Sequence, residues 1–181
     1  MGYSVDRSPG LVTVGAPEVR VRRAEAADWA SYRDIRLQAL ESEPWAFGST
    51  LLREREYPES RWRELVARDS ADSPAATWAA VDEVDRFVGI VVAARLEGTF
   101  HIFAMWVAPE RRGQGIAGRL LDAALAWIER MAPGGPVVLE VNPRAVAAVR
   151  LYLSRGFRAT GKFTTLDHTP SERVQEMIRP G

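Results

Sequence analysis

The sequence contains no cysteine, and this absence removes several kinds of chemistry at once. Disulfides, thiolate metal sites and a thiol nucleophile all require cysteine. Histidine is scarce as well, because His101 and His168 are the only two in the chain. Two imidazoles that far apart in sequence do not suggest a zinc site. We therefore expect no metal cofactor.

Long apolar runs are missing too. No stretch approaches the ~20 residues that a membrane-spanning helix needs, and the first residues lack the apolar core of a signal peptide. The 24 basic and 24 acidic residues cancel, so no global field attracts nucleic acid or an anionic membrane. We expect a soluble, cytoplasmic protein that binds neither.

The 181 residues are enough for one domain with a substantial core. Residues 1–17 combine glycine, proline and serine without sustained periodicity, which predicts a flexible N-terminal tail. Residues 18–181 are expected to form a single domain, because no composition shift or repeat divides them.

Hydrophobic periodicity in residues 18–181 predicts a mixed α and β order. Asp28 is a candidate N-cap for the first helix, which contains Tyr32, Ile35, Ala39 and Leu40 at helical spacing. Further helices are predicted at residues 58–68, 116–131 and 144–155. Strands are predicted at residues 19–23, 76–81, 87–94, 99–107 and 137–141, from 157 onward, and at 173–178.

The segment from Arg111 to Gly118 is the most informative part of the sequence. It joins the apolar strand that ends at Val107 to the helix predicted to begin near Ile116. Such a junction directs several backbone N–H groups to one point, where the positive end of a helix favours an anion. Glycines let the main chain approach a phosphate closely, and Arg111 and Arg112 add positive charge. We interpret this segment as a pyrophosphate cradle.

Gly113, Gly115 and Gly118 also match the G-x-G-x-x-G pattern of dinucleotide-binding folds, with Glu140 as the acidic residue about 20 positions on. In that fold the first glycine follows its strand directly, whereas residues 108–112 intervene here. An antiparallel meander precedes the segment, and too few residues follow Glu140 for a second mononucleotide-binding half. An NAD-linked oxidoreductase is therefore the weaker alternative.

Residues 107–117 resemble motif A of the GCN5-related N-acetyltransferases (GNAT family). The core of that motif is Gln or Arg, two residues, Gly, one residue, then Gly or Ala; Arg112, Gly115 and Ala117 meet it. Residues 139–157 resemble motif B in Leu139–Asn142, Ala148, Leu151–Tyr152 and Gly156–Phe157. The resemblance covers residues 19–179. It implies an α/β fold with about four helices around a mostly antiparallel mixed sheet of about seven strands, splayed between strands 4 and 5.

The resemblance further implies that acetyl-coenzyme A lies in this opening as the acetyl donor. Its pyrophosphate is expected on the cradle and its pantetheine arm along the preceding strand. The implied cofactor-binding residues are Met105, Trp106, Val107, Arg112, Gly113, Gln114, Gly115, Ile116, Ala117 and Gly118. One position departs from the family pattern: many relatives carry an asparagine where this chain has Ala145, so that contact is not expected here.

The implied reaction is acetyl transfer to a primary amine. Such an amine has a pKa of ~10.4, which disfavours the neutral nucleophile at pH 7 by roughly 4.6 kcal/mol. Because the chain lacks cysteine and a Ser-His-Asp arrangement, direct attack in a ternary complex is the simplest mechanism. The family uses the tyrosine that matches Tyr152 as the general acid for the leaving thiolate. Tyr152 is therefore expected to be catalytic.

Glu140 is the residue expected to act as the general base. Alternation along residues 137–142 places Val138, Glu140 and Asn142 on one face of a strand. A carboxylate among apolar neighbours is well suited to accept a proton, and some family members use a glutamate here through water. A solvated carboxylate or a salt-bridge partner is the alternative for Glu140, and His101 is a competing base.

The acceptor amine is not identified by the sequence. Trp45, Phe47 and Tyr57 are candidates for an apolar acceptor pocket, and Glu54 and Glu56 either attract a cationic amine or form a solvated loop. A small-molecule amine, an antibiotic, a peptide N-terminus and a lysine all remain open. A non-catalytic acyl-coenzyme A-binding regulatory domain is the alternative to an enzyme. The resemblance also admits a homodimer.

Overall fold

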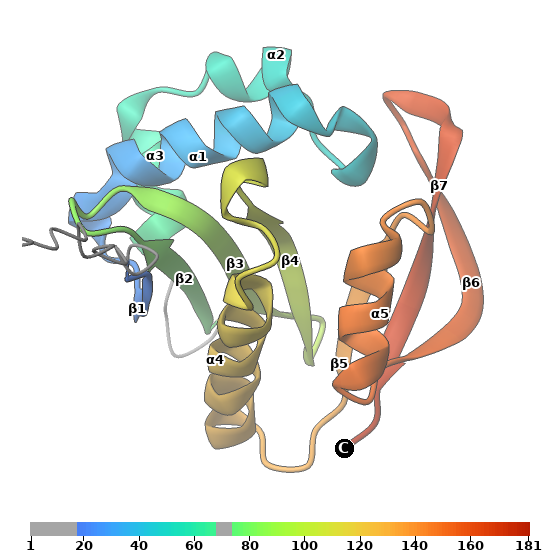
Figure 1. The fold of residues 1–181 in the computed structure, drawn as a ribbon. Coiled ribbons are helices and arrows are strands. Elements are labelled where there is room, and N and C mark those ends of the chain that lie inside the picture. Colours follow the sequence, from blue (N-terminus) through green and yellow to red (C-terminus); the bar gives the residue numbers. More distant parts are fainter. Residues whose placement is uncertain (1–17, 68–73) are drawn as a thin grey trace, which may run out of the picture.

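The computed structural model describes residues 18–67 and 74–181 and shows the mixed α and β fold that the sequence predicts (Figure 1). Its strands are β1 Arg20–Arg23, β2 Ala75–Val81, β3 Phe87–Leu96, β4 Thr99–Val107, β5 Val137–Val141, β6 Arg158–Leu166 and β7 Thr169–Arg179. Its α-helices are α1 Trp29–Ser42, α2 Leu51–Arg55, α3 Glu59–Ala67, α4 Ile116–Met131 and α5 Val146–Ser154. Short 3-10 helices occur at η1 Ala26–Asp28, η2 Pro44–Ala46 and η3 Pro109–Arg111. The predicted tail, residues 1–17, and the predicted helix end at Arg68 lie outside the described residues.

The strands form one sheet in the order β1-β2-β3-β4-β5-β7-β6. Neighbouring strands are antiparallel except for β4 and β5, which are parallel. This confirms the predicted mostly antiparallel mixed sheet. A dinucleotide-binding fold is built on a mostly parallel sheet, so the topology rules out that alternative for the glycine motif.

The predicted splay between the fourth and fifth strands is present. The β4–β5 pairing covers only Phe100–Ile102 against Val137–Leu139, although β4 continues to Val107. At this point β4 also changes register against β3, and Ala104 adopts a positive φ of 49°. Such an irregularity bends a strand and increases its twist. The two strands therefore diverge, and Figure 1 shows the resulting opening between the β1–β4 half of the sheet and the β5–β7 half.

Strand β2 is buried along its whole length because helices cover both faces of this half of the sheet (Figure 1). Trp78 and Ala80 belong to the core with α4, whereas Ala79 and Val81 belong to the core with α1 and α3. Trp127 of α4 packs edge-on against Trp78 at 5.6 Å between ring centroids. Burying a large side chain of this kind contributes roughly 1.5–3 kcal/mol.

Helix α4 buries the face that its periodicity predicts. Ile116, Leu120, Ala124, Trp127 and Ile128 are all buried. By helical spacing Met131 falls on the same face, but it is 49% exposed. It is the last residue of the helix, and helical spacing does not record where the covered part of a helix ends.

Gly89 in β3 lets α4 lie close to the sheet beside the end of β4. A Cβ at this position would lie 3.0 Å from Leu120 Cδ1 and 3.2 Å from the Trp106 carbonyl oxygen. Both distances are shorter than ordinary van der Waals contact, so any larger side chain would force α4 or β4 to shift. The absence of a side chain thus helps to place the N-terminus of α4.

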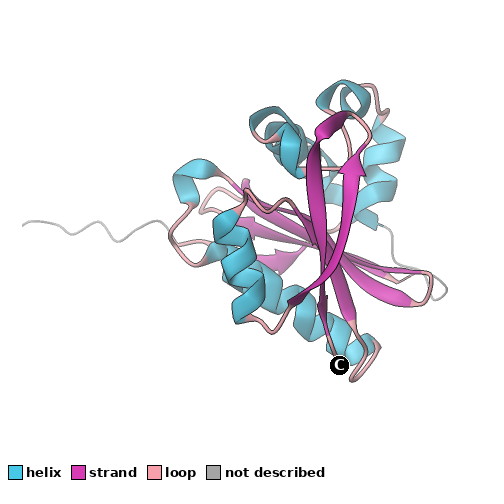
Figure 2. Ribbon diagram, turned by 90° about the vertical axis from the view of Figure 1, so that its right-hand side faces the viewer, coloured by secondary structure: helices cyan, strands magenta, loops and turns pink. Residues whose placement is uncertain are grey.

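The β6–β7 hairpin and α5 form the other wall of the opening. Figure 2 looks onto this side and shows the two long, twisted strands of the hairpin. The hairpin turn reaches the 3-10 helix η2, where His168 Nε2 lies 3.3 Å from the Pro44 carbonyl oxygen. Helix α5 begins at Val146, later than the predicted Arg144, and β7 begins at Thr169, earlier than the predicted Arg173.

Helix α2 was not predicted, because five residues are too few to show helical periodicity. Thr50 caps it by accepting a hydrogen bond from the Arg53 N–H at 3.2 Å. Its Glu54 is not a solvated loop carboxylate: it is 5% exposed and bonds Arg36 of α1 at 2.9 and 2.8 Å. Asp28 precedes α1 as predicted, but its side chain bonds Arg22 and the Glu25 N–H instead of capping that helix.

Replacing Glu54 with glutamine is expected to destabilise the protein by about 3 kcal/mol, because it leaves the buried Arg36 charge without a counter-ion. Urea unfolding followed by circular dichroism measures this change in the free energy of unfolding. The matched control is Glu56→Gln, at an exposed residue next to the same helix, which should change stability by less than about 0.5 kcal/mol. Equal effects of the two substitutions would contradict the prediction.

Candidate active site

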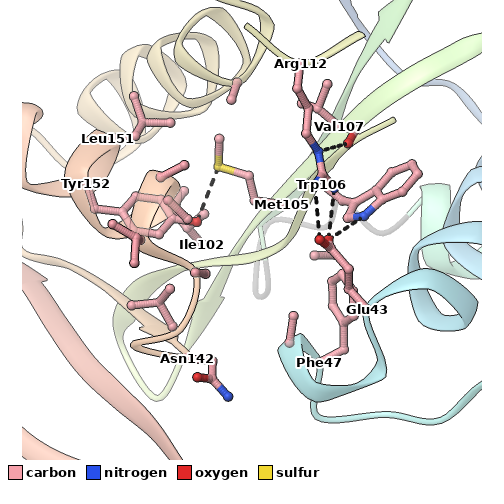
Figure 3. Close-up of a pocket in the computed structure, with 18 of the residues that line it drawn as sticks. Glu43, Phe47, Ile102, Met105, Trp106, Val107, Arg112, Asn142, Leu151 and Tyr152 are labelled. Carbon is pink, nitrogen blue, oxygen red and sulfur yellow. Dashed lines mark hydrogen bonds and ion pairs between the residues drawn. The ribbon is translucent and has the colours of Figure 1, made fainter. Parts of the chain in front are cut away.

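The opening between β4 and β5 holds a cavity of about 590 Å³. Its walls come from the end of β4, the loop and first turn of α4, the end of β5, α5, and the segment that contains η2 (Figure 3). The residues predicted from the two sequence motifs therefore meet around one space, although they lie on elements far apart in the chain.

The N-terminus of α4 carries a row of unused hydrogen-bond donors. Gly113 and Gly115 have φ values of 76° and 72°, which turn the chain into the helix. Within the described chain, none of the backbone N–H groups of residues 113–118 donates a hydrogen bond, and the first bond of the helix runs from the Arg119 N–H to the Gly115 carbonyl. No atom of a described residue lies within 4 Å of where a Cβ would stand on either glycine. We refer to the N–H groups of residues 113–118 as the anion nest.

The nest fits a diphosphate in charge as well as in shape. Consecutive N–H groups at a helix start form an anion-binding concavity, favoured by the helix dipole. Arg111 lines the cavity, and its guanidinium has no partner among the described residues. Gln114 and Gly118 do not line the cavity. A Cβ at Gly118 would lie 3.1 Å from Arg155 Nη2, which indicates that this glycine serves the packing of α5 against α4.

The predicted pantetheine strand forms the side wall of the cavity. Met105, Trp106 and Val107 all line it, and Trp106 and Val107 are themselves buried. Beyond Ile102, β4 has no partner on its β5 side, so its main chain borders the cavity there. The side chains of Ile116 and Ala117 complete this wall at the start of α4.

Tyr152 lies on the opposite wall, on α5. Its side chain is 6% exposed and packs edge-on against Phe157. Its hydroxyl donates to the Met105 sulfur across the cavity at 3.5 Å (Figure 3). A thioether is a weak acceptor, so this proton is available to a better one. Burial raises the pKa of Tyr152 above its ordinary value, and the phenol therefore keeps its proton at neutral pH.

Glu43, at the end of α1, is a site residue that the sequence did not reveal. Its carboxylate accepts two hydrogen bonds from Arg112, at 3.1 and 3.0 Å, and one from the Trp106 indole N–H at 2.9 Å (Figure 3). Arg112 also donates to the Val107 carbonyl at 3.0 Å. Arg112 is therefore not a free charge beside the cradle, as its sequence position suggested, but a brace between α1 and the loop that leads to the nest.

Replacing Glu43 with glutamine is expected to weaken acetyl-coenzyme A binding about 10-fold. The charge-assisted bonds that hold Arg112 become ordinary ones, and the loop before the nest loses its fixed position. Isothermal titration calorimetry measures the dissociation constant. Glu41→Gln on the same helix is the control, because Glu41 is exposed and contacts only Arg55 among the described residues. Unchanged or tighter binding by the Glu43 variant would contradict a bracing role.

Glu140 lines the cavity from β5, but its surroundings differ from the prediction. It is exposed, while Leu139 and Val141 on either side of it are buried. Alternation therefore correctly separated Glu140 from its two buried neighbours, but the surroundings of Glu140 are open rather than apolar. His101, the competing base, is not among the lining residues and stacks on Phe103 instead.

Asn142 is buried at the end of β5 and joins three segments. Its amide donates to the Trp45 carbonyl at 3.2 Å and to Glu172 at 2.7 Å, and its oxygen accepts from the Arg144 N–H. Arg144 also forms an ion pair with Glu172. The Asn142 amide, and after it the Arg144 guanidinium, hold the pKa of Glu172 below its usual value. This cluster fixes the hairpin and η2 at the rim of the cavity.

The three candidate acceptor residues separate into two places. Trp45 and Phe47 line the main cavity, with the Arg144 guanidinium 5.2 Å from the Trp45 ring. Tyr57 does not: it packs on Trp62 and lines a second cavity of about 250 Å³. Phe103 and Ala104 of β4 border both cavities.

In residues 18–67 and 74–181, every helix is too short or too polar to cross a bilayer. No cluster of three or more His, Cys, Asp or Glu side chains suited to a metal ion occurs among those residues.

Comparison with known proteins agrees with this geometry. The family model described as the acetyltransferase (GNAT) family matches residues 35–157, which include most of the sheet, the nest and α5. The chain belongs to this family. The resemblance carried by the two sequence motifs is thereby confirmed.

The individual relatives share only limited sequence identity with this chain. The chain is 35% identical over 99 residues to the peptidyl-lysine N-acetyltransferase YjaB of Salmonella typhimurium, a match that spans 55% of this chain and 60% of that relative. A GCN5-related N-acetyltransferase from Kribbella flavida has the same fold, with a TM-score of 0.71 and 23% identity over 90% of this chain and 98% of that one. The structure of yncA from Salmonella typhimurium with its cofactor acetyl-CoA gives a TM-score of 0.72 and 18% identity over 90% and 94%.

Proposed function

We propose that this protein transfers an acetyl group from acetyl-coenzyme A directly to a primary amine of a small molecule, peptide or protein, in a ternary complex. The observation that carries the proposal is the anion nest, a row of unused N–H donors at the mouth of the main cavity. Membership of the GNAT family supports the same activity. So does the similarity to a peptidyl-lysine N-acetyltransferase, although this chain spans only 60% of that relative.

The donor's diphosphate would be held by the nest and by Arg111, and its arm by the main chain of Met105–Val107. Acetyl-coenzyme A supplies an activated acetyl thioester. Ala145 lines the cavity where many relatives place an asparagine, so this chain holds the arm without that amide. Trp45 and Phe47 close the same cavity from the α1 side.

Tyr152 is proposed as the general acid. Its hydroxyl points across the cavity and bonds only a weak thioether acceptor. Burial raises its pKa, so the hydroxyl stays protonated near neutral pH and can hydrogen-bond the departing sulfur, passing its proton on as negative charge develops there. A thiol of ordinary pKa, about 8.5 by analogy with cysteine, is already a fair leaving group, so the assistance required is moderate.

Glu140 is proposed as the general base, acting on the acceptor ammonium through water. It is exposed to the cavity, and it lies on the strand across the opening from β4. Glu140→Gln is expected to lower kcat/KM about 100-fold at pH 7 and much less above pH 10, where the amine is already neutral. The control is Glu83→Gln, at an exposed residue in the β2–β3 turn. A pH-independent loss would assign Glu140 a different role.

Release of free thiol on mixing with acetyl-coenzyme A and a panel of amines tests the function as a whole. An acetyltransferase releases thiol in proportion to the amine supplied. A protein that binds acetyl-coenzyme A, as judged by a raised melting temperature, but never releases thiol would be a non-catalytic acyl-coenzyme A-binding domain. A melting temperature raised by NADH and not by acetyl-coenzyme A would contradict both the acetyltransferase and the acyl-coenzyme A-binding domain.

A further inference from the structure

The second cavity lies between α1, α2 and α3 and the edge of β4. The residues with polar side chains in its lining are Tyr32, Arg36, Ser49, Arg53, Glu54, Tyr57 and Arg61. Nothing in the proposed chemistry of the acetyl donor uses this cavity. It nevertheless borders the main cavity through Phe103 and Ala104, next to the Met105 that Tyr152 contacts.

Arg36 has a donor left over in this lining. It is 9% exposed, and it bonds Glu54 through Nε and Nη2. Its third nitrogen, Nη1, is buried and has no hydrogen-bond partner in residues 18–67 and 74–181. The Phe47 ring lies 4.8 Å from the guanidinium carbon. The side chain is therefore fixed by a bidentate ion pair and by an aromatic face, with one buried N–H₂ group unused.

Ser49 offers a second unused group in the same lining. Its hydroxyl oxygen is also buried without a partner. Among the described residues, Arg36 Nη1 and Ser49 Oγ are the buried side-chain nitrogen and oxygen atoms that lack a hydrogen bond. Leaving such groups unpaired is costly, and native proteins rarely do so without a ligand or water to complete them. Both groups can donate, so the missing partner is a hydrogen-bond acceptor.

The charge of the lining indicates that this acceptor is an anion. Arg36 is neutralised by Glu54, and Arg61 is paired with Glu64 at 2.8 Å outside the cavity. The guanidinium of Arg53 has no partner among the described residues. The lining contains three arginines and one carboxylate, and among the described residues Arg53 is the lining charge without a counter-ion. A polyamine or another purely cationic amine would be repelled here, whereas a carboxylate would meet a positive field and two buried donors.

We propose that the second cavity binds a carboxylate of the acceptor, so that the substrate is an amine that also bears a carboxylate. This inference rests on the proposed acetyltransferase function and names its substrate class. With its carboxylate beside Arg36 and Ser49, such a molecule extends past Phe103 and Ala104 and brings its amine to the wall of the main cavity at Met105. The two cavities then hold the acceptor and the donor on opposite sides of the β4 bulge.

Matched acceptors test the proposal. One set is ω-aminopentanoate, its carboxamide and pentylamine; the other is Nα-acetyl-lysine and its methylamide. In each set the amine is remote from the varied group, so its pKa hardly changes and only the carboxylate differs. Thiol release with saturating acetyl-coenzyme A gives kcat/KM for each acceptor. We expect at least one carboxylate-bearing acceptor to be preferred about 10-fold or more over its neutral partner.

Two variants test whether the second cavity causes the preference for carboxylate-bearing acceptors. Arg53→Gln removes a charge at an exposed position, and Arg55→Gln is its control on the same helix, because Arg55 does not line either cavity. Ser49→Ala removes an unpaired hydroxyl, so it should leave the melting temperature of the free protein unchanged or raise it. Both Arg53→Gln and Ser49→Ala should lower kcat/KM several-fold for the carboxylate-bearing acceptor and leave its neutral partner unaffected.

The outcomes separate the two proposals. If the carboxylate-bearing acceptor and its neutral partner are acetylated at equal rates, the carboxylate site is overturned and the acetyltransferase function stays intact. The same holds if the variants lower kcat/KM equally for the two acceptors. Preference for the purely cationic pentylamine would do the same. Binding of acetyl-coenzyme A without thiol release for any acceptor would overturn the proposed function, and the carboxylate site with it.

Discussion

Replacing Gly115 with valine is expected to weaken acetyl-coenzyme A binding about 100-fold. Gly115 has a φ of 72°, a conformation that a β-branched residue adopts only with strain of about 1–3 kcal/mol. A side chain at this position would also project into the open space over the anion nest, where a diphosphate is expected. Strain and lost N–H contacts together account for the factor, since 1.4 kcal/mol corresponds to tenfold in affinity.

Gly98→Val is the matched control for this prediction. Gly98 lies in the β3–β4 turn with a φ of 87°, and it too has nothing within 4 Å of a Cβ. The control therefore carries similar backbone strain away from the cavity. Calorimetric titration with acetyl-coenzyme A, together with thermal unfolding of both variants, separates lost binding from lost stability. Equal dissociation constants for the two variants would mean that the nest does not hold the diphosphate.

Tyr152→Phe is expected to lower kcat about 100-fold while leaving the acetyl-coenzyme A dissociation constant within a few-fold of the original. Phenylalanine keeps the ring that packs on Phe157 and removes only the hydroxyl, whose one hydrogen bond to a described residue is the weak bond to Met105. Stability should therefore hardly change. The expected loss is that of one general acid, typically 10²–10⁴-fold, towards its lower end because a thiolate leaves readily.

Single-turnover measurements are the appropriate assay, because slow product release would otherwise mask the chemical step. The pH profile provides a second test. Burial raises the pKa of Tyr152, so the hydroxyl keeps its proton as the pH rises, and the unmodified protein should show no loss of kcat from tyrosine ionisation below about pH 10. Full single-turnover activity of the phenylalanine variant would remove Tyr152 from the chemistry.

The long elements were predictable because their signals are local. Helix α4 repeats its apolar residues at helical spacing over 16 residues, and β2 and β3 are apolar runs around a polar turn. Helix α2 escaped prediction because its five residues cover little more than one turn. Its Glu54 also looked solvated, since nothing in the neighbouring residues indicates that Arg36, 18 positions earlier, lies against it.

In the candidate site too, some features depend on neighbouring residues and could be predicted, whereas others depend on residues far apart in the sequence. The nest was visible in the sequence, because glycine spacing and the start of a helix determine where backbone N–H groups remain unused. Glu43 was not, since its partner Arg112 is 69 residues away and becomes adjacent only when α1 packs across the sheet. The open surroundings of Glu140 likewise depend on how far β4 and β5 diverge, which alternation along one strand does not record.

By itself, the sequence determined the order of the long helices and strands, the anion nest and the family to which the chain belongs. Those features depend on interactions between residues that lie within a few positions of one another in the sequence. Only the tertiary structure decided which charges are paired, which donors are left over, and that two cavities meet at the β4 bulge. Such features depend on side chains brought together from distant segments, where burial rather than sequence spacing sets the energy of each contact.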